Sequence, residues 1–171
     1  MSMTSNEFWT VFHGLVFGSV YLLAFAGGFE ALWGLGKSEV MTEAGLKHRL
    51  KRLNVGTILM AIISWVTVIS GTYIVYPWYR AKAPTSPRSL LLANPEKAQW
   101  HTFAMEWKEH VAWFVPILAT VVAFVVIYYG KDLIERNELR KIIFIFFILA
   151  FAFAAIAGLW GAFINKAAPI I

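Results

Sequence analysis

The sequence has no cysteine and few charged residues. None of its 171 residues is Cys, and Asp, Glu, Lys and Arg together make up 15% of the chain. The missing cysteines exclude disulfides, iron–sulfur clusters, zinc ribbons and haem attached through thioether bonds. Soluble domains carry about 25% charged residues. So low a charge content, beside 59% hydrophobic residues, argues against a soluble enzyme.

Motifs for independent catalysis are absent as well. The sequence has no nucleophile elbow, phosphate-binding loop, HExxH helix or Rossmann glycine pattern, and no Asn-x-Ser/Thr glycosylation acceptor. The net charge of +5 comes from bases that gather between the apolar segments. We therefore attribute it to membrane topology and lipid headgroups, and expect no nucleic-acid partner.

Long apolar runs are what the sequence has instead. They cover about residues 8–35, 53–76, 110–130 and 142–164. A helix that crosses the bilayer needs about 20 apolar residues. The pattern predicts an all-α integral membrane protein, in which residues 1–171 form a single bundle of four transmembrane helices.

The basic residues predict the orientation of this bundle. Nine of the fifteen bases lie in two short connections, residues 37–52 and 131–141. The positive-inside rule then places these connections in the cytoplasm and both termini outside. Residues 77–109 form an outer loop with four prolines, which we expect to be irregular up to Pro95 and to lead into a helix near Glu96.

Small residues recur along three of the four segments. Gly14 and Gly18 form a small-xxx-small pair in the first segment. The others are Thr57, Ser64, Thr67 and Gly71 in the second segment and Ala150, Ala154, Ala157, Gly158 and Gly161 in the fourth. Small residues let helix backbones approach in lipid, so we expect close packing at these positions. Pro116 should bend the third helix at Ala112, and Glu30 should be a satisfied acid at the inner boundary.

Two histidines lie at similar depth near the outer boundary, on different helices. His13 is about one turn inside the first helix, and His110 opens the apolar part of the third. Two imidazoles that face each other across a bundle are the axial ligands of a six-coordinate haem b. We therefore predict a haem held by His13 and His110, with His101 as the substitute ligand.

Other residues extend this prediction. Gly14, beside His13, would let a porphyrin lie against the backbone, and Glu106 would hold the second ring nitrogen of His110. Arg80 and Lys108 would meet the haem propionates, as would Lys82 and Lys97. Three alternatives remain open: ordinary interfacial histidines, a pigment with one axial histidine, and a metal bound by some of His101, Met105, Glu106, Glu109 and His110.

In its general layout the chain resembles the four-helix membrane cytochrome b subunits of respiratory oxidoreductases. That resemblance implies a subunit of a respiratory or photosynthetic electron-transfer complex in the bacterial inner membrane. The chain would link an outer-side redox protein to membrane quinone, among other membrane subunits and lipid. The alternatives are a cofactor-free scaffold subunit and, third, a small transporter or channel.

Overall fold

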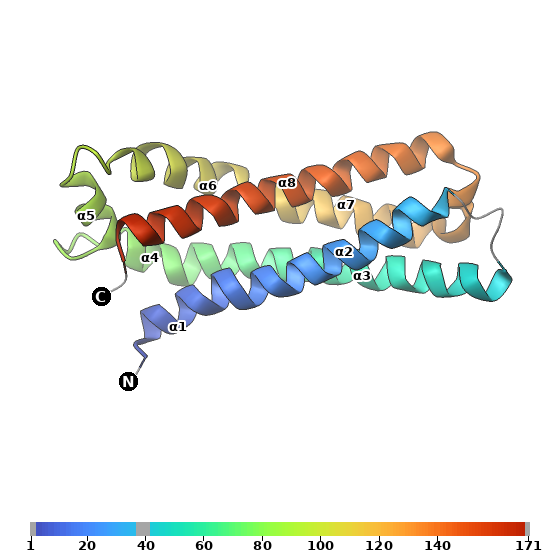
Figure 1. Ribbon diagram of the computed structural model, residues 1–171, viewed down its shortest axis with the longest axis horizontal. Helices are drawn as coiled ribbons and strands as arrows, with labels where there is room; N and C mark the ends of the chain where they lie inside the picture. The colour runs from blue at the N-terminus through green and yellow to red at the C-terminus, as the bar shows by residue number, and fades with distance from the viewer. Residues whose placement is uncertain (1–2, 37–41, 170–171) are drawn as a thin grey trace.

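The structure, a computed structural model, describes residues 3–36 and 42–169. Within this part of the chain it contains helices and no strand. Three of the four long helices in Figure 1 are made of several consecutive elements. The first consists of α1 (Ser5–Val11), the π-helical turn η1 (Phe12–Val16) and α2 (Phe17–Leu35). The second consists of α3 (Glu43–Ser70), the π-helical turn η3 (Gly71–Val75) and α4 (Tyr76–Tyr79).

The second half of the chain forms the other two long helices. The third long helix consists of the π-helical turn η4 (Trp100–Met105), α6 (Glu106–Val111), α7 (Phe114–Tyr129) and the 3-10 turn η5 (Gly130–Ile134). The fourth is α8 (Asn137–Ala167) alone. The short helix α5 (Pro87–Leu92) lies between the second and the third.

All four long helices have the length and composition of membrane spans. They contain 31, 37, 35 and 31 residues, and each includes the apolar segment predicted for it. At about 1.5 Å per residue, each is longer than the roughly 30 Å hydrocarbon core. The prediction of four transmembrane helices is confirmed, and the chain is a multi-pass membrane protein.

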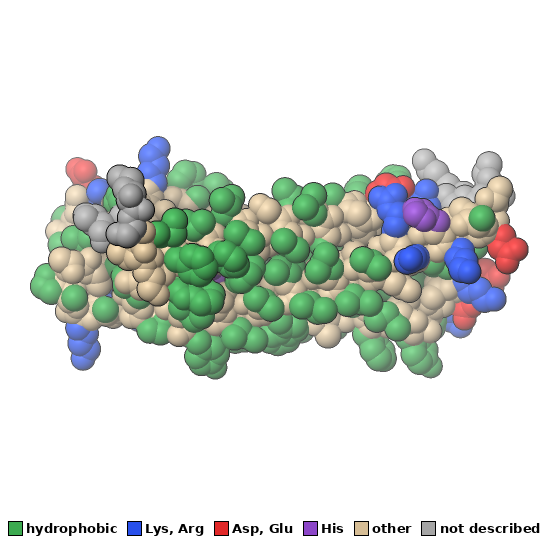
Figure 2. All heavy atoms as spheres, turned by 90° about the horizontal axis from the view of Figure 1, so that it is seen from below, with side chains coloured by type: hydrophobic (Ala, Val, Ile, Leu, Met, Phe, Trp, Pro, Cys, Tyr) green, Lys and Arg blue, Asp and Glu red, His purple; other side chains and the backbone are tan. Residues whose placement is uncertain are grey.

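Both chain ends lie at the same end of the bundle, with α4, α5 and α6 (Figure 1). We call this the terminal end. The opposite end, where α2 leads towards α3 and η5 towards α8, is the basic end. The face drawn in Figure 2 has hydrophobic side chains along its middle and charged ones near both ends. The side of the membrane on which each end lies stays a prediction, and Lys37, one of the nine bases behind it, falls outside the described residues.

The helices pack in the order α2, α3, α7, α8. One apolar core runs through all four, with Phe147, Leu32, Leu53 and Val122 fully buried. In the basic half, α8 closes against α2 through stacked rings, since Phe25 lies 5.0 Å from Phe147 and 3.9 Å from Phe151 between ring centroids.

The small residues act partly as predicted. Thr57 and Ser64 are buried, and their hydroxyls donate hydrogen bonds to carbonyls of their own helix. The two helices approach each other closely at Gly28 and Gly56, a pair that was not predicted. A Cβ on Gly56 would lie 2.9 Å from the Gly28 backbone nitrogen.

The prediction of close packing at Gly14 and Gly18 is wrong. A Cβ at either residue would meet nothing within 4 Å, and the same holds for Gly158 on α8. These three glycines therefore leave open space beside their helices.

The prolines at the terminal end have different effects. Pro77 does not end the second helix as predicted, because the helix continues past it to Tyr79 and Pro77 lies in the first turn of α4, directly after the π-helical turn η3. Pro116 does interrupt the third helix as predicted. The backbone N–H of Val115 donates to the Ala112 carbonyl (3.2 Å) between α6 and α7.

The predicted outer loop 77–109 is correspondingly shorter. Helix occupies its first residues up to Tyr79, the stretch Pro87–Leu92 and everything from Trp100 onward. The third helix begins at Trp100 rather than near Glu96, because the residues after Pro95 form turns, with Lys97 and Ala98 both donating to the Asn94 carbonyl.

Candidate functional site

Polar and titratable side chains gather inside the terminal end of the bundle. They form two groups. The His13 group consists of His13, Ser70 and Lys108 and lies among η1, α3 and α6. The Arg80 network joins α4, α5, η4 and α6. Its members are Tyr76, Tyr79, Arg80, Arg88, His101, Glu106 and Glu109.

His13 is held on the inner side of its helix by the second long helix. Its Nδ1 lies 3.2 Å from the Ser70 hydroxyl oxygen, which itself donates to the Thr67 carbonyl (3.0 Å). Since the Ser70 hydrogen is used there, His13 Nδ1 must carry the hydrogen of the shared bond. Nε2 then keeps its lone pair, as in an imidazole that ligates a metal.

Gly71 makes room for this ring. A Cβ on Gly71 would lie 2.7 Å from Cε1 of His13. The ring therefore packs against bare backbone, at the point where the α-helix becomes the π-helical turn η3. His13 itself lies within the π-helical turn η1 of its own helix, and such turns in long helices are frequent at functional sites.

Lys108 reaches from α6 into the bundle. Its ammonium is near enough to His13 for their charges to interact, and a Cβ on Gly161 of α8 would lie 2.8 Å from its Nζ. The neighbouring acids Glu106 and Glu109 pair with Arg80 instead. Among the described residues no carboxylate balances this ammonium, and an ionisable group inside a membrane bundle marks a candidate site.

A buried hydroxyl without a partner lies at the middle of the first long helix. The hydroxyl of Tyr21, two turns further along the helix from His13, is buried and has no hydrogen bond within the described part of the chain. A buried hydroxyl without a partner costs free energy of roughly 1–3 kcal/mol.

His110 lies on a different side of the third helix. It is two residues from Lys108, about 200° around an α-helix. Its ring is exposed on the face that also exposes Phe114 and Ile117. Its Nδ1 lies 2.7 Å from the backbone carbonyl of Glu106, while the Glu106 carboxylate, predicted to hold this ring, pairs with Arg80 instead. The structure does not bring His13 and His110 together.

His101 is buried and both of its ring nitrogens are engaged. Nδ1 lies 3.0 Å from the Tyr79 hydroxyl, and Arg88 Nε donates to Nε2 (3.2 Å). The lone pair that would bind iron therefore already accepts a hydrogen bond. In this arrangement His101 is not open to serve as the substitute ligand.

Arg80 is engaged in the same way. Its guanidinium donates to the Glu106 carboxylate (2.5 Å) and the Glu109 carboxylate (2.9 Å), and the Tyr76 hydroxyl also donates to Glu109 (2.9 Å). Two carboxylates surround this cation, which leaves it poorly suited to a propionate. The Arg80 network instead fastens the segment after the second helix to the third.

Metal-binding clusters are missing from residues 3–36 and 42–169, where no three His, Asp or Glu side chains come close enough to share an ion. The candidate set His101, Met105, Glu106, Glu109 and His110 is divided between the Arg80 network and the exposed face of His110.

Sequence reasoning missed Ser70 and Tyr21, and it predicted Gly161 only as a packing residue. Ser70 continues the stripe of Ser64 and Thr67 at helical spacing, so that stripe was the available signal. No sequence signal marks Tyr21, because its surroundings depend on which helices face each other. Comparison of the chain with protein-family models, curated proteins and solved structures found no match.

Proposed function

We propose that the chain is a membrane subunit of an electron-transfer complex that holds haem b in the terminal half of its bundle. His13 is the axial ligand that this chain supplies, and Lys108 is the counter-ion of a propionate. The subunit would connect a redox protein at the outer surface with quinone in the bacterial inner membrane. The function is the one predicted from the sequence. Of the predicted axial ligands His13, His110 and His101, only His13 is retained.

One observation carries the proposal: the Lys108 ammonium is near enough to His13 for their charges to interact, and no carboxylate among the described residues pairs with it. An ion inside a membrane bundle is costly unless paired. A group that combines a metal with carboxylates would use both the His13 lone pair and the Lys108 charge. Haem is such a group, and the open sides of Gly14, Gly18 and Gly158 leave space beside the helices for a flat ring.

This chain would contribute an axial ligand for the haem iron, a positive charge for a propionate and the helices around the haem. Ser70 fixes the His13 tautomer, so Nε2 is the nitrogen whose lone pair would be available to a ligand. Lys108 would hold one propionate inside the bundle, where such a pair is strong. The haem would supply the one-electron chemistry when bound.

A reduced-minus-oxidised absorbance spectrum tests the proposal. The protein is purified in detergent together with its native complex, reduced with dithionite, and then mixed with a short-chain quinone. We expect a b-type α-band after reduction and its loss as the quinone takes the electrons. A complex in which no haem absorbance belongs to this chain would contradict the proposal.

The cofactor-free scaffold is the second candidate, and the position of His110 favours it. Because His110 is exposed on the outward face, the chain offers one inward histidine rather than a facing pair. In a scaffold, His13 and Ser70 would be a packing contact between the first two helices. Replacing His13 by Leu would then leave the composition of the assembly unchanged, and the protein would be colourless.

A further inference from the structure

Two adjoining cavities at the basic end are not used by the proposed function. The first, of about 320 Å³, is lined by Glu30, Thr42, Gly45, His48, Arg49 and Arg52. The second, of about 380 Å³, lies along the seam between α2 and α3. Its lining is Leu23, Ala24, Gly27, His48, Lys51, Arg52, Val55, Gly56 and Leu59. Since His48 and Arg52 line both cavities, the two form one site with a polar and an apolar part.

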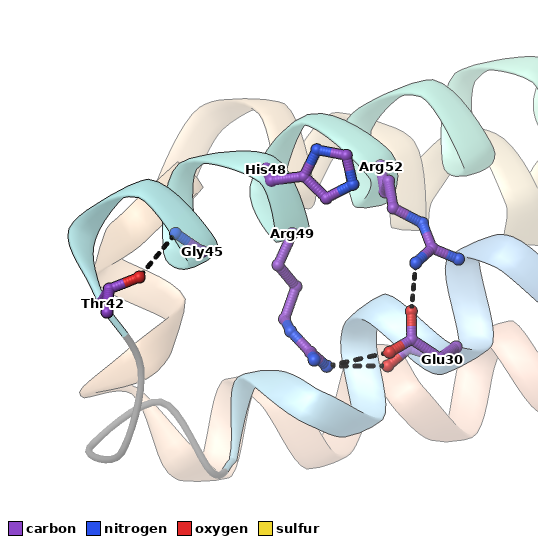
Figure 3. A pocket seen from close by; sticks show the side chains of 6 residues that line it. All are labelled: Glu30, Thr42, Gly45, His48, Arg49 and Arg52. Atoms are coloured by element: carbon purple, nitrogen blue, oxygen red, sulfur yellow. Dashed lines mark hydrogen bonds and ion pairs between the residues drawn. The ribbon is translucent and has the colours of Figure 1, made fainter.

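The polar part is cationic although it contains a carboxylate. Arg49 and Arg52 both point towards Glu30 (Figure 3) and pair with it at 3.3 Å and 3.0 Å. The Glu30 charge is therefore shared between two guanidinium groups. With Lys51, three cationic side chains line the joined site against one acid, so the site as a whole attracts an anion.

Gly34 allows Arg49 to take this position. A Cβ on Gly34 would lie only 1.2 Å from an Arg49 guanidinium nitrogen, so the side chain of Arg49 lies directly across this glycine. The same guanidinium also donates to the Glu30 backbone carbonyl (3.2 Å). Arg49 is thus fixed at the wall of the cavity rather than free in solvent.

The apolar part runs into the membrane-spanning region. Leu23, Val55 and Leu59 line it and are exposed on the outside of the bundle, where lipid chains lie. Gly27 forms part of its wall, and a Cβ there would meet nothing within 4 Å. The missing side chain of Gly27 therefore widens the groove between α2 and α3.

We infer that this site binds one anionic phospholipid. Its phosphodiester would lie against His48, Lys51 and Arg52, and an acyl chain would follow the groove beside Gly27. The charge of the site selects an anionic headgroup over a zwitterionic one, and the adjoining apolar groove selects an amphiphile over free phosphate. The inference does not depend on haem binding.

Native mass spectrometry of the detergent-purified chain tests this inference, with phosphatidylglycerol and phosphatidylcholine of the same acyl chains as probes. We expect one phosphatidylglycerol to be retained in preference to phosphatidylcholine. Lys51→Gln should weaken retention about fivefold, the effect of one cation near a lipid headgroup. Gly27→Leu should weaken it by filling the groove. The matched control Lys131→Gln removes an exposed charge at the same end but outside the site.

Three results would overturn the inference. The first is equal retention of the two lipids. The second is an equal loss for Lys51→Gln and Lys131→Gln, which would mean that surface charge alone attracts lipid. The third is a Gly27→Leu variant that retains the lipid fully while inorganic phosphate displaces it, which would mean that only a phosphate is bound. Far-ultraviolet circular dichroism of each variant establishes that it is folded.

Discussion

At the scale of single residues, the terminal half of the bundle contains an imidazole and an ammonium whose surroundings are incomplete, and a buried hydroxyl without a partner lies at the middle of the first helix. His13 has a defined tautomer through Ser70, while the Lys108 ammonium and the Tyr21 hydroxyl have no partner among the described residues. Structures leave few buried polar groups unsatisfied. A bound group with a metal and carboxylates would satisfy the imidazole and the ammonium together.

Replacing Gly71 by Ala tests the position of the His13 ring. The added methyl would lie 2.7 Å from Cε1, so the ring must move and its bond to Ser70 must lengthen or break. We expect Gly71→Ala to lose at least half of the haem, measured by absorbance per chain. The control is Gly27→Ala in the basic half of the bundle, whose methyl also meets nothing within 4 Å and which takes no part in the proposed haem site. Equal haem in both variants would contradict the ligand role of His13.

Replacing Lys108 by Met tests the counter-ion. Met has a similar length without the charge, so it removes the ammonium that faces the proposed propionate. We expect haem to dissociate about tenfold more readily from Lys108→Met than from the wild type, in line with a partly buried ion pair. Lys97→Met is the matched control, because Lys97 is exposed and donates only to the Ala167 carbonyl. An unchanged haem affinity in Lys108→Met would exclude this role.

The candidate residues could be predicted from the sequence only in part. Titratable side chains are rare inside apolar runs, and on this basis His13 and His110 were predicted as site residues. Which side of a helix each one occupies depends on the partner helix. His110 therefore proved exposed, whereas Lys108, predicted at the outer surface, reaches into the bundle beside His13.

At the scale of the elements, the contact between α2 and α3 determines the form of the bundle. Gly28 and Gly56 bring the two backbones together, and Phe147 of α8 packs on the other side of Gly28. Away from this contact, Gly14 and Gly18 line the first helix where no neighbour fills the space. Glycine thus lets the two backbones meet at Gly28 and Gly56 and leaves open space at Gly14 and Gly18.

Gly56→Ala should destabilise the protein. Its methyl would lie 2.9 Å from the Gly28 nitrogen and 3.1 Å from the Ala24 carbonyl oxygen, and these backbone atoms cannot rotate away. Overpacking of this kind costs about 1–3 kcal/mol. Thermal unfolding in detergent would measure the change, with Gly27→Ala as the neutral control because its methyl meets no atom within 4 Å. Identical melting of the two variants would contradict the packing described here.

The long helices were predictable and their details were not. The length of the apolar runs alone identified all four helices, since a membrane-spanning helix is one of the few structures that contain so many consecutive apolar residues. The π-helical turns at Phe12–Val16 and Gly71–Val75 leave no composition signal. The predicted end of the second helix at Pro77 was wrong, because a proline is also compatible with the first turn of a further helical segment.

At the scale of the whole molecule, the bundle has different chemistry at its two ends. The terminal end contains the His13 group and the Arg80 network. The basic end contains a cationic cavity that opens towards lipid.

Cysteine labelling tests the predicted orientation. The chain has no cysteine, so Thr85→Cys and Lys131→Cys each introduce a unique thiol at an exposed position, at opposite ends of the bundle. If the basic connections face the cytoplasm, a membrane-impermeant maleimide should label Thr85→Cys in intact cells. It should label Lys131→Cys only after permeabilisation. The opposite pattern would reverse the assigned topology.

The central claim is that His13 holds a haem iron, and one spectroscopic comparison tests it most directly. Reduced-minus-oxidised spectra and haem content per chain are measured for the wild type, His13→Leu, His110→Leu and His48→Leu, all purified identically. We predict that His13→Leu loses the b-type band, while His48→Leu, at the basic end, keeps it. His110→Leu should also keep it, because that ring is exposed on the outward face. A band of full intensity in His13→Leu would contradict the account.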